Sequence, residues 1–354
     1  MSFETDSQAI PMELGIYTFG DIVPDPRTGR AVSSVERMRQ VIEIARLADD
    51  AGLDIIGVGE HHQLKFVNSA TATMIAAMAA VTRRIRLTSA STLLSTADPV
   101  RTFQEFATAD LVSNGRVEII FGRGAFTDNF PLFGYDLDDY DALFMEKLDL
   151  FAELNAHERV TWSGRFRPAL KNAEIAPRPV QAKLPVWIGA GRPETVARAA
   201  MLGYPLALPM VGGSLSNYAH TTDVYRRAWQ ESGHPATDIR IATFSHLHVT
   251  ETTRETREDF YPNYSTYLGQ LFNGPMPAVY AQMLSPQGAL VAGSPQEVID
   301  KILAQHEALG TTRYVGQIDI GGQPFADIVK GIELFAAKVA PAVRAATALV
   351  TERA

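Results

Sequence analysis

The sequence contains no cysteine, which excludes disulfide bonds, thiolate nucleophiles and zinc sites built on cysteine. It has no dense patch of lysine and arginine, and its net charge is −8, from 32 basic and 40 acidic residues. Nucleic acids and anionic membrane surfaces are therefore poor partners for it. The longest apolar run, MIAAMAAV at 74–81, is too short to cross a bilayer. The first thirteen residues lack the basic start and apolar core of a signal peptide, so we expect a cytoplasmic protein.

Short apolar runs alternate with helical patterns along the chain, which is typical of βα units around a parallel sheet. We expect strands at 14–19, 54–59, 85–92, 116–122, 185–190, 205–211, 239–249 and 313–320. We expect helices at 34–51, 69–82, 99–113, 139–155, 193–202, 217–231, 295–309 and 324–346. Eight such pairs predict an α/β protein with a single (β/α)₈ TIM barrel, and an open doubly wound sheet is the alternative.

The barrel is predicted over 14–346, between tails at 1–13 and 347–354. Two segments break the alternation. Residues 159–184 form a polar, proline-containing stretch that we interpret as a small β excursion, and residues 252–292 show no clean period. Both are insertions and candidate lids, because long connections in compact domains are often functional. In a barrel of this kind the active site lies at the carboxyl ends of the strands.

The second expected strand ends in GVGEHHQ, with Glu60, His61 and His62 in a row. Successive side chains of a strand point to opposite faces, so the two histidines are poorly placed to share one metal ion. No HExxH spacing occurs either, and we expect no metal site. An imidazole at a barrel mouth titrates near neutrality, which favours proton transfer by His61. His62 is better explained by a hydrogen bond to Glu60 within the loop.

The stretch GAGRPETVARAAMLG begins a helix with Pro193 at its first position, which makes Arg192 the N-cap. Arginine cannot accept hydrogen bonds, so another group must satisfy the free N–H groups of the first turn. A phosphate could do so together with the Arg192 guanidinium and the Thr195 hydroxyl, next to Gly191. A surface turn capped by water or by Glu194 is the alternative.

The stretch FGRGAF places Arg123 between Gly122 and Gly124, just past a strand, where small neighbours let the backbone approach a ligand. An ion pair of Arg123 with a surface acid such as Asp128 is the alternative. Two arginines at two strand ends, each beside glycine, favour a phosphate site.

Three apolar residues at strand positions are better explained as core than as pocket residues from their type alone. These residues are Phe19, Trp187 and Met210.

Taken together, these stretches resemble the bacterial luciferase-like flavin-dependent monooxygenase family. The resemblance covers nearly all of 14–346 and rests on segments in the same order. These segments are GEHH, the 89–124 stretch from SASTLLSTADPV to FGRG, FPLFGYD, PVWIGAGRPETVARAAMLGYP, GSPQEVIDKI and IDIGGQP.

The resemblance implies a (β/α)₈ barrel that binds reduced FMN at the strand carboxyl ends. O₂ would attack the flavin, and the resulting peroxyflavin would oxidise a small organic substrate. Arg123 and Thr195 match phosphate-binding positions, and Arg192 stands where the family often has a small polar residue. Gly124, Gly191 and Arg192 are expected to bind the cofactor beside them. Ala90 and Ser91 match a non-prolyl cis peptide under the flavin ring, His61 a proposed base, and Met210 a bulky position beside the ring.

Gly122 stands where luciferase itself has a cysteine, so the resemblance does not extend to light emission. Two alternatives share the same barrel: a deazaflavin-dependent dehydrogenase and a non-enzymatic flavin-binding protein. Nothing in the chain resembles an NADH-binding unit, so a separate flavin reductase is expected as a partner. A homodimer is expected through the helices at 69–82 and 98–113.

Overall fold

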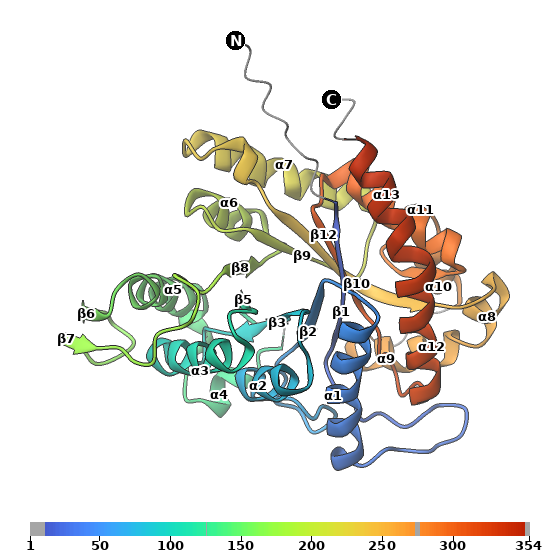
Figure 1. The fold of residues 1–354 in the computed structure, drawn as a ribbon, viewed down its shortest axis with the longest axis horizontal. Helices are drawn as coiled ribbons and strands as arrows, with labels where there is room; N and C mark the ends of the chain where they lie inside the picture. The colour runs from blue at the N-terminus through green and yellow to red at the C-terminus, as the bar shows by residue number, and fades with distance from the viewer. Residues whose placement is uncertain (1–10, 125, 273–276, 351–354) are drawn as a thin grey trace, which may run out of the picture.

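Eight parallel strands close into a barrel in the computed structural model, which describes residues 11–124, 126–272 and 277–350 (Figure 1). The strands are β1 (Glu13–Thr18), β2 (Ile55–Val58), β3 (Arg86–Ser89), β5 (Val117–Gly122), β8 (Val186–Gly189), β9 (Leu206–Met210), β10 (Ile241–Val249) and β12 (Arg313–Gln317). The barrel is closed because β12 pairs with both β1 and β10, and β10 pairs with β9. The predicted single barrel is confirmed, and the open sheet is excluded.

Helices surround the barrel in the order that the alternation predicts. They are α1 (Ser34–Asp50), α2 (Thr71–Val81), α3 (Pro99–Ser113), α5 (Tyr140–Ala156), α6 (Pro193–Met201), α7 (Leu215–Glu231), α11 (Pro295–Leu309), α12 (Phe325–Leu334) and α13 (Ala340–Val350). The helix predicted at 324–346 passes through one π-helical turn (Phe335–Val339) between α12 and α13. Shorter helical turns lie at α4 (Asn129–Leu132), Leu137–Asp139 and Ala236–Asp238.

Local capping explains where several helices begin and end. The Ser33 hydroxyl accepts a hydrogen bond from the Glu36 N–H at 3.1 Å at the start of α1. Asp98 does the same for the Arg101 N–H at 3.0 Å, with Pro99 in the first position of α3. Asn114 ends α3 in the left-handed conformation, at φ 58°.

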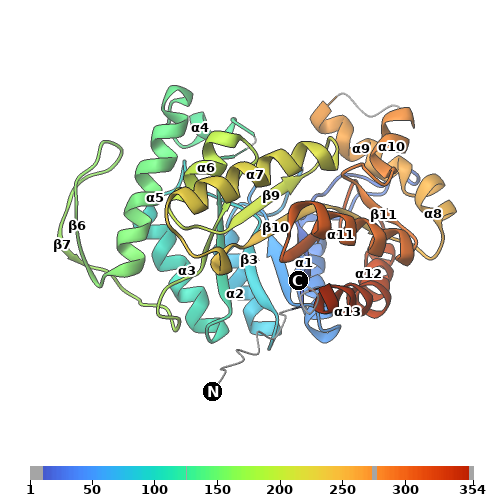
Figure 2. The same cartoon turned by 90° about the horizontal axis from the view of Figure 1, so that it is seen from above.

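The two insertions have different structures. Residues 159–184 contain the predicted β excursion, an antiparallel hairpin of β6 (Arg159–Trp162) and β7 (Leu170–Glu174). Figure 2 shows this hairpin beyond α5, on the side of the molecule opposite to α8. Residues 252–292, where the sequence predicts no regular element, instead contain α8 (Thr253–Glu258), α9 (Tyr261–Phe272), α10 (Pro277–Leu284) and β11 (Val291–Gly293). Residues 273–276 of this segment lie outside the described residues.

The helices of the second insertion escaped prediction because they do not pack an aliphatic stripe against the barrel. They form a small core of their own that is rich in aromatic side chains and includes Phe260, Tyr264 and Tyr280. Aromatic rings at irregular spacing hide the helical period on which sequence prediction depends.

The barrel interior is filled by side chains from alternate strand positions, as closed parallel barrels require. The interior cluster consists of Tyr17, Ile55, Ile120, Trp187, Ala207, Ala242, Phe244 and Val315. The amino end of the barrel is filled by the buried ion pair of Arg313 with Glu118. A cavity opens instead at the carboxyl end.

The predicted tails at 1–13 and 347–354 fall partly outside the described residues, which exclude 1–10 and 351–354. β1 already begins at Glu13, and α13 extends to Val350. None of the helices in the described part of the chain is long and apolar enough to cross a membrane.

Candidate active site

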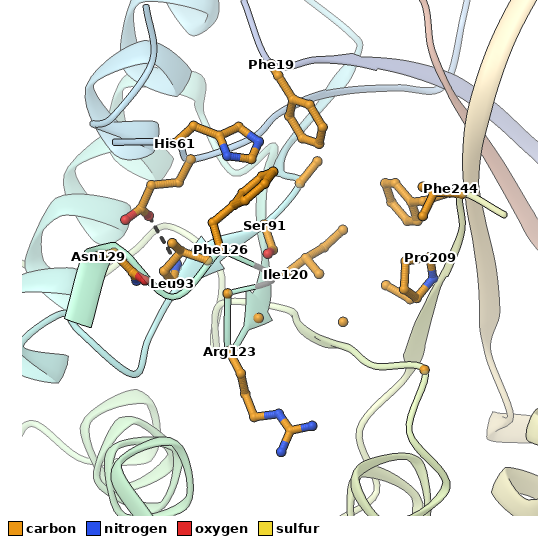
Figure 3. Close-up of a pocket in the computed structure, with 18 of the residues that line it drawn as sticks. Phe19, His61, Ser91, Leu93, Ile120, Arg123, Phe126, Asn129, Pro209 and Phe244 are labelled. Atoms are coloured by element: carbon orange, nitrogen blue, oxygen red, sulfur yellow. Dashed lines mark hydrogen bonds between the residues drawn. The ribbon is translucent and has the colours of Figure 1, made fainter. Parts of the chain in front are cut away.

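A cavity of about 580 Å³ opens at the carboxyl end of the barrel. Its volume is in the range of small-molecule and cofactor sites. Figure 3 shows Phe19 and His61 at one end, Arg123 at the opposite end, and Phe244 across from Ser91. Residues within or just after seven of the eight barrel strands line it, and none of the described lining residues comes from β12.

The loop after β2 brings Glu60, His61 and His62 to the cavity. The strand ends at Val58, so the alternation of faces expected for the two histidines does not apply, and both line the cavity. The His62 Nε2 lies 2.9 Å from the Glu60 Oε1, as predicted for that pair. The other carboxylate oxygen, Oε2, accepts a hydrogen bond from the Leu93 N–H at 3.1 Å.

His61 lies in a box of aromatic rings. Phe66 stacks on the imidazole at 4.1 Å, and Phe19 and Phe126 meet it edge-on at 4.4 and 5.3 Å. This burial, aided by the nearby charge of Lys65, lowers the pKa of His61 to about 4. The expected titration near neutrality is therefore wrong, and the imidazole is neutral at pH 7. Its Nε2 is buried and has no hydrogen-bond partner among the described residues.

The loop after β3 contains a cis peptide between Ala90 and Ser91, and both residues line the cavity. Gly122, at the end of β5, faces this peptide, and a Cβ at that position would overlap the Ser91 Oγ. Small residues from two neighbouring strand ends thus form this part of the cavity wall. Small side chains leave room for a flat ligand, and a larger residue at position 122 would displace Ser91.

The opposite end of the cavity is cationic. Arg123 and Arg192 both line it, as does Tyr140. Burial raises the pKa of the Tyr140 hydroxyl, and the charges of both arginines oppose that rise. The Arg123 guanidinium lies 5.1 Å from the centre of the Tyr140 ring and forms an ion pair with the exposed Asp141. The predicted ion pair with a surface acid exists, but its partner is Asp141 and not Asp128.

The amino end of α6 opens onto the same region. Arg192 is its N-cap residue and provides no side-chain hydrogen bond to the first turn, as the sequence predicts. Gly191 precedes it and lines the cavity, as does Gly124, whose φ of 90° favours glycine. Thr195 lies in the first turn of α6, is half-buried and does not line the cavity.

Met210 lies outside the cavity, and its side chain is 1% exposed in the core between the barrel and its helices. Its neighbours Pro209 and Val211 line the cavity instead, because strand side chains alternate between the two faces. Reasoning from residue type alone placed Met210 in the core, in agreement with the structure, whereas the family resemblance placed it beside the ring. Trp187 is also a core residue, but Phe19 lines the cavity.

Several lining residues were not identified from the sequence. Phe244 and His246 project inward from β10, and Tyr267 and Leu268 come from α9. The alternation along β10 could have indicated the first two. No local pattern indicates the α9 residues, because their position depends on how the insertion folds back over the barrel.

The described residues contain no group of three or more histidine, aspartate or glutamate side chains arranged to bind a metal ion. The cavity itself offers a cationic end, apolar walls and a buried neutral imidazole. Together these features suit an anionic, flat organic ligand that extends from Arg123 and Arg192 toward His61.

The sequence matches the model of a family described as luciferase-like monooxygenase over residues 12–312. An uncharacterized protein of Sinorhizobium fredii is 25% identical, covering 92% of this chain and 97% of that protein. The oxygenase component of flavin-dependent trigonelline monooxygenase from Acinetobacter baylyi is 25% identical over 52% of this chain and 50% of its own. An F420-dependent glucose-6-phosphate dehydrogenase of Amycolatopsis mediterranei is 32% identical over 47% of this chain and 51% of its own. The match thus spans about half the length of these last two relatives.

Solved structures share the whole fold. A monooxygenase from Streptomyces bottropensis has a TM-score of 0.82 at 24% identity and covers 94% of this chain and 99% of its own. The oxygenating constituent of 3,6-diketocamphane monooxygenase from Pseudomonas putida, in complex with FMN, has a TM-score of 0.76 at 19% identity, with the same coverage. At these identities the likeness demonstrates the common barrel.

Proposed function

The chain belongs to the luciferase-like monooxygenase family, and we propose that it uses reduced FMN and O₂ to oxidise a small organic substrate. One observation carries this proposal. A single apolar cavity joins two arginines at one end to a buried, neutral histidine at the other. This arrangement matches a cofactor with an anionic tail and a flat reactive ring.

Arg123 and Arg192 would hold the phosphate of FMN by charge-assisted hydrogen bonds. The free N–H groups at the start of α6, with the Thr195 hydroxyl in its first turn, would add to this site. Gly124 and Gly191 would allow the backbone to approach the phosphate closely. A role for Met210 in contact with the ring is not proposed, because Pro209 and Val211 occupy the inward positions of that strand.

The small residues Ala90, Ser91 and Gly122 would support the ring system. When bound, reduced FMN supplies the electrons that activate O₂ for attack on the substrate. The protein's own contribution is to orient the ring and to keep water away from it, and the apolar walls serve both purposes.

His61 would accept a proton from the substrate or from the oxidant during the reaction. A neutral imidazole is required for this, and burial among Phe19, Phe66 and Phe126 keeps it neutral. Its unpartnered Nε2 leaves the ring free of a competing hydrogen bond at that atom. Glu60 and His62 would position the loop that carries His61.

A deazaflavin-dependent dehydrogenase is the second candidate, because one relative is named as F420-dependent. Coenzyme F420 has an anionic glutamate tail beyond its phosphate. Asp141, paired with Arg123, and Glu194, in the first turn of α6, add negative charge beside the arginine end of the cavity. Like charges oppose binding there, which favours FMN. A purely structural flavin-binding role leaves the aromatic enclosure of His61 without a purpose.

We further propose a separate flavin reductase as partner and a homodimer as the assembly. The relation to the oxygenase component of trigonelline monooxygenase supports the reductase. Exposed Val81, Leu111 and Val112 on α2 and α3 support a dimer through these helices. Light scattering coupled to size-exclusion chromatography would test the dimer, and a monomer that persists at high concentration would contradict it.

Anaerobic titration with reduced FMN and, in parallel, with reduced F420 would test the cofactor. We expect FMN to bind more tightly, and ¹⁸O₂ to leave one labelled oxygen atom in the product. If reduced FMN does not bind, the proposal is wrong. If F420 binds and substrate is oxidised without O₂, the dehydrogenase is correct.

A further inference from the structure

One wall of the cavity is built from β10 and α9 and is separate from the residues assigned above. His246, at 1% exposure, projects from β10, and Tyr267, at 6%, projects from α9. Their rings meet edge-on at 5.2 Å. In the order of strands around the barrel, β10 is three strands from β2, which leads to His61, and three strands from β5, which leads to Arg123.

The hydrogen bonds of His246 determine which group it presents to the cavity. The Tyr264 hydroxyl lies 3.0 Å from the His246 Nδ1 and 3.6 Å from the Met283 sulfur. Imidazole nitrogen accepts hydrogen bonds more strongly than a thioether does, so Tyr264 donates to Nδ1. On this basis we assign the hydrogen of the imidazole to Nε2, since the only hydrogen-bond contact of the ring to a described residue is the one at Nδ1. His246 therefore presents an N–H donor.

Tyr267 provides a second donor beside it. Its hydroxyl donates to the Gln317 Oε1 at 3.3 Å, which is longer than the usual range of about 2.5–3.0 Å between oxygens. Such a weak hydrogen bond is readily exchanged for a better acceptor. The hydroxyl can thus turn from Gln317 toward an oxygen atom in the cavity.

The cavity-lining residues around this pair carry no formal charge. The lining residues from β1, β9, β10 and α9 are aromatic, aliphatic or neutral, and include Tyr17, Phe19, Ala207, Pro209, Val211, Phe244 and Leu268. A charged substrate group on this wall would lose its hydration without a counter-ion, which is strongly unfavourable. A neutral oxygen is satisfied by two donors.

We propose that His246 and Tyr267 bind the oxygen atom of an uncharged, mainly apolar and ring-containing substrate. The inference rests on the proposed function, since it assigns the substrate end of the same cavity. The wall built from β10 and α9 would then determine substrate specificity. Its two donors favour a substrate with a hydrogen-bond acceptor, and its aromatic side chains favour a substrate with a ring.

Three small probes test the inference directly: acetophenone, ethylbenzene and benzoate. The first two differ only in a carbonyl oxygen, and benzoate adds a charge. Binding is measured by ligand-observed NMR on the full chain, with and without FMN. We expect acetophenone to bind about tenfold more tightly than ethylbenzene, as one or two net hydrogen bonds would give. Benzoate should bind more weakly than both while FMN or inorganic phosphate occupies the arginine end of the cavity.

The variants His246→Phe and Tyr267→Phe remove the donors and keep a ring. Each should reduce the preference for acetophenone over ethylbenzene toward one, while His246→Gln, which retains an N–H donor, should restore part of it. Tyr280→Phe is the matched control, because Tyr280 is a buried tyrosine of the same insertion whose hydroxyl bonds the Thr256 carbonyl at 2.6 Å, outside the cavity. The control should keep the wild-type preference.

FMN affinity, measured in parallel, separates this inference from the proposed function. If the wild-type protein does not bind FMN, the proposed function is wrong. The preference for acetophenone over ethylbenzene is measured without FMN as well, so it tests the present inference separately. An unchanged preference in His246→Phe overturns the role of His246. Two results overturn the substrate class. One is equal binding of benzoate and acetophenone while FMN or inorganic phosphate occupies the arginine end, and the other is no binding of acetophenone or ethylbenzene to the wild type.

Discussion

The Glu60 Oε2 accepts a hydrogen bond from the Leu93 N–H at 3.1 Å and thereby ties together the loops that follow β2 and β3. One of these loops carries His61, and the other carries the Ala90–Ser91 peptide. The second carboxylate oxygen of Glu60 lies 2.9 Å from the His62 Nε2. The acid in the GEHH stretch thus links two walls of the cavity through a contact between residues 33 positions apart in the chain.

Glu60→Ala should therefore lower both stability and FMN affinity. The Leu93 N–H would lose its acceptor in a half-buried position, at a cost of about 1–3 kcal/mol. Glu60→Gln is the matched control, since its amide oxygen can still accept from Leu93. Urea unfolding and fluorescence titration with FMN provide the measurements. Equal effects of the two substitutions would show that the carboxylate charge, and not the acceptor, matters.

His61→Asn should slow turnover by about 10²–10⁴-fold, as loss of a proton-transfer group does, and leave FMN affinity unchanged. Because burial lowers the pKa of His61 to about 4, wild-type kcat/KM should show no inflection near pH 6.5 from this residue. Steady-state kinetics between pH 4 and 8 would measure both effects. His157→Asn, at an exposed histidine, is the control. A variant that loses FMN binding but no turnover at saturating FMN would make His61 structural.

Arg123→Ala and Arg192→Ala should each weaken FMN binding by about 10–100-fold, which corresponds to a charge-assisted hydrogen bond of about 1.5–3 kcal/mol. Riboflavin lacks the phosphate and provides the control ligand. Its affinity should be nearly the same in wild type and variants. If riboflavin binding falls as much as FMN binding, the arginines do not act on a phosphate.

Gly122→Ala should reduce FMN affinity and stability, because the new methyl group would overlap the Ser91 Oγ and displace the loop after β3. The double variant Ser91→Ala with Gly122→Ala removes that oxygen and should recover part of the loss. A double-mutant cycle on FMN affinity tests the coupling. Additive losses would mean that the two residues do not interact.

Asp21 shapes the pH dependence of stability. Burial and the neighbouring Asp319 raise the pKa of Asp21 from 3.8 to about 7, although Arg37 lies 3.8 Å away and the Gly321 N–H bonds the carboxyl at 3.0 Å. Between these two values the folded state holds a proton that the unfolded chain has released. Stability from this group therefore falls as pH rises through the interval.

Asp21→Asn abolishes that titration and keeps an acceptor for the Gly321 N–H. The stability of the variant relative to wild type should therefore improve as pH rises from 4 to 8, by urea unfolding. Asp259→Asn, at an exposed position, should show no such trend. A pH-independent difference for Asp21→Asn would mean that Asp21 is already ionised in the folded state at pH 4.

Local sequence patterns accounted for the barrel, the helices around it and most of their ends. Asp98 before Pro99, and Asn114 before Gly115, mark the ends of α3 through hydrogen bonds between near neighbours. The alternation of apolar runs determined the eight strands, because backbone pairing and burial impose a short period on the chain. The same patterns place Arg123 and Arg192 at strand ends, and the structure brings both to one cavity.

Only the tertiary structure decided what those ends surround. In the folded chain the side chain of Met210 lies in the core and that of Pro209 in the cavity. Three aromatic rings enclose His61 and keep it neutral. Tyr267, from an insertion, lies beside His246. Strand periods and helix caps depend on residues a few positions apart, so the sequence determines them directly. The volume of a cavity, the pKa of a buried group and the pairing of two donors depend on contacts between distant segments, which exist only once the chain has folded.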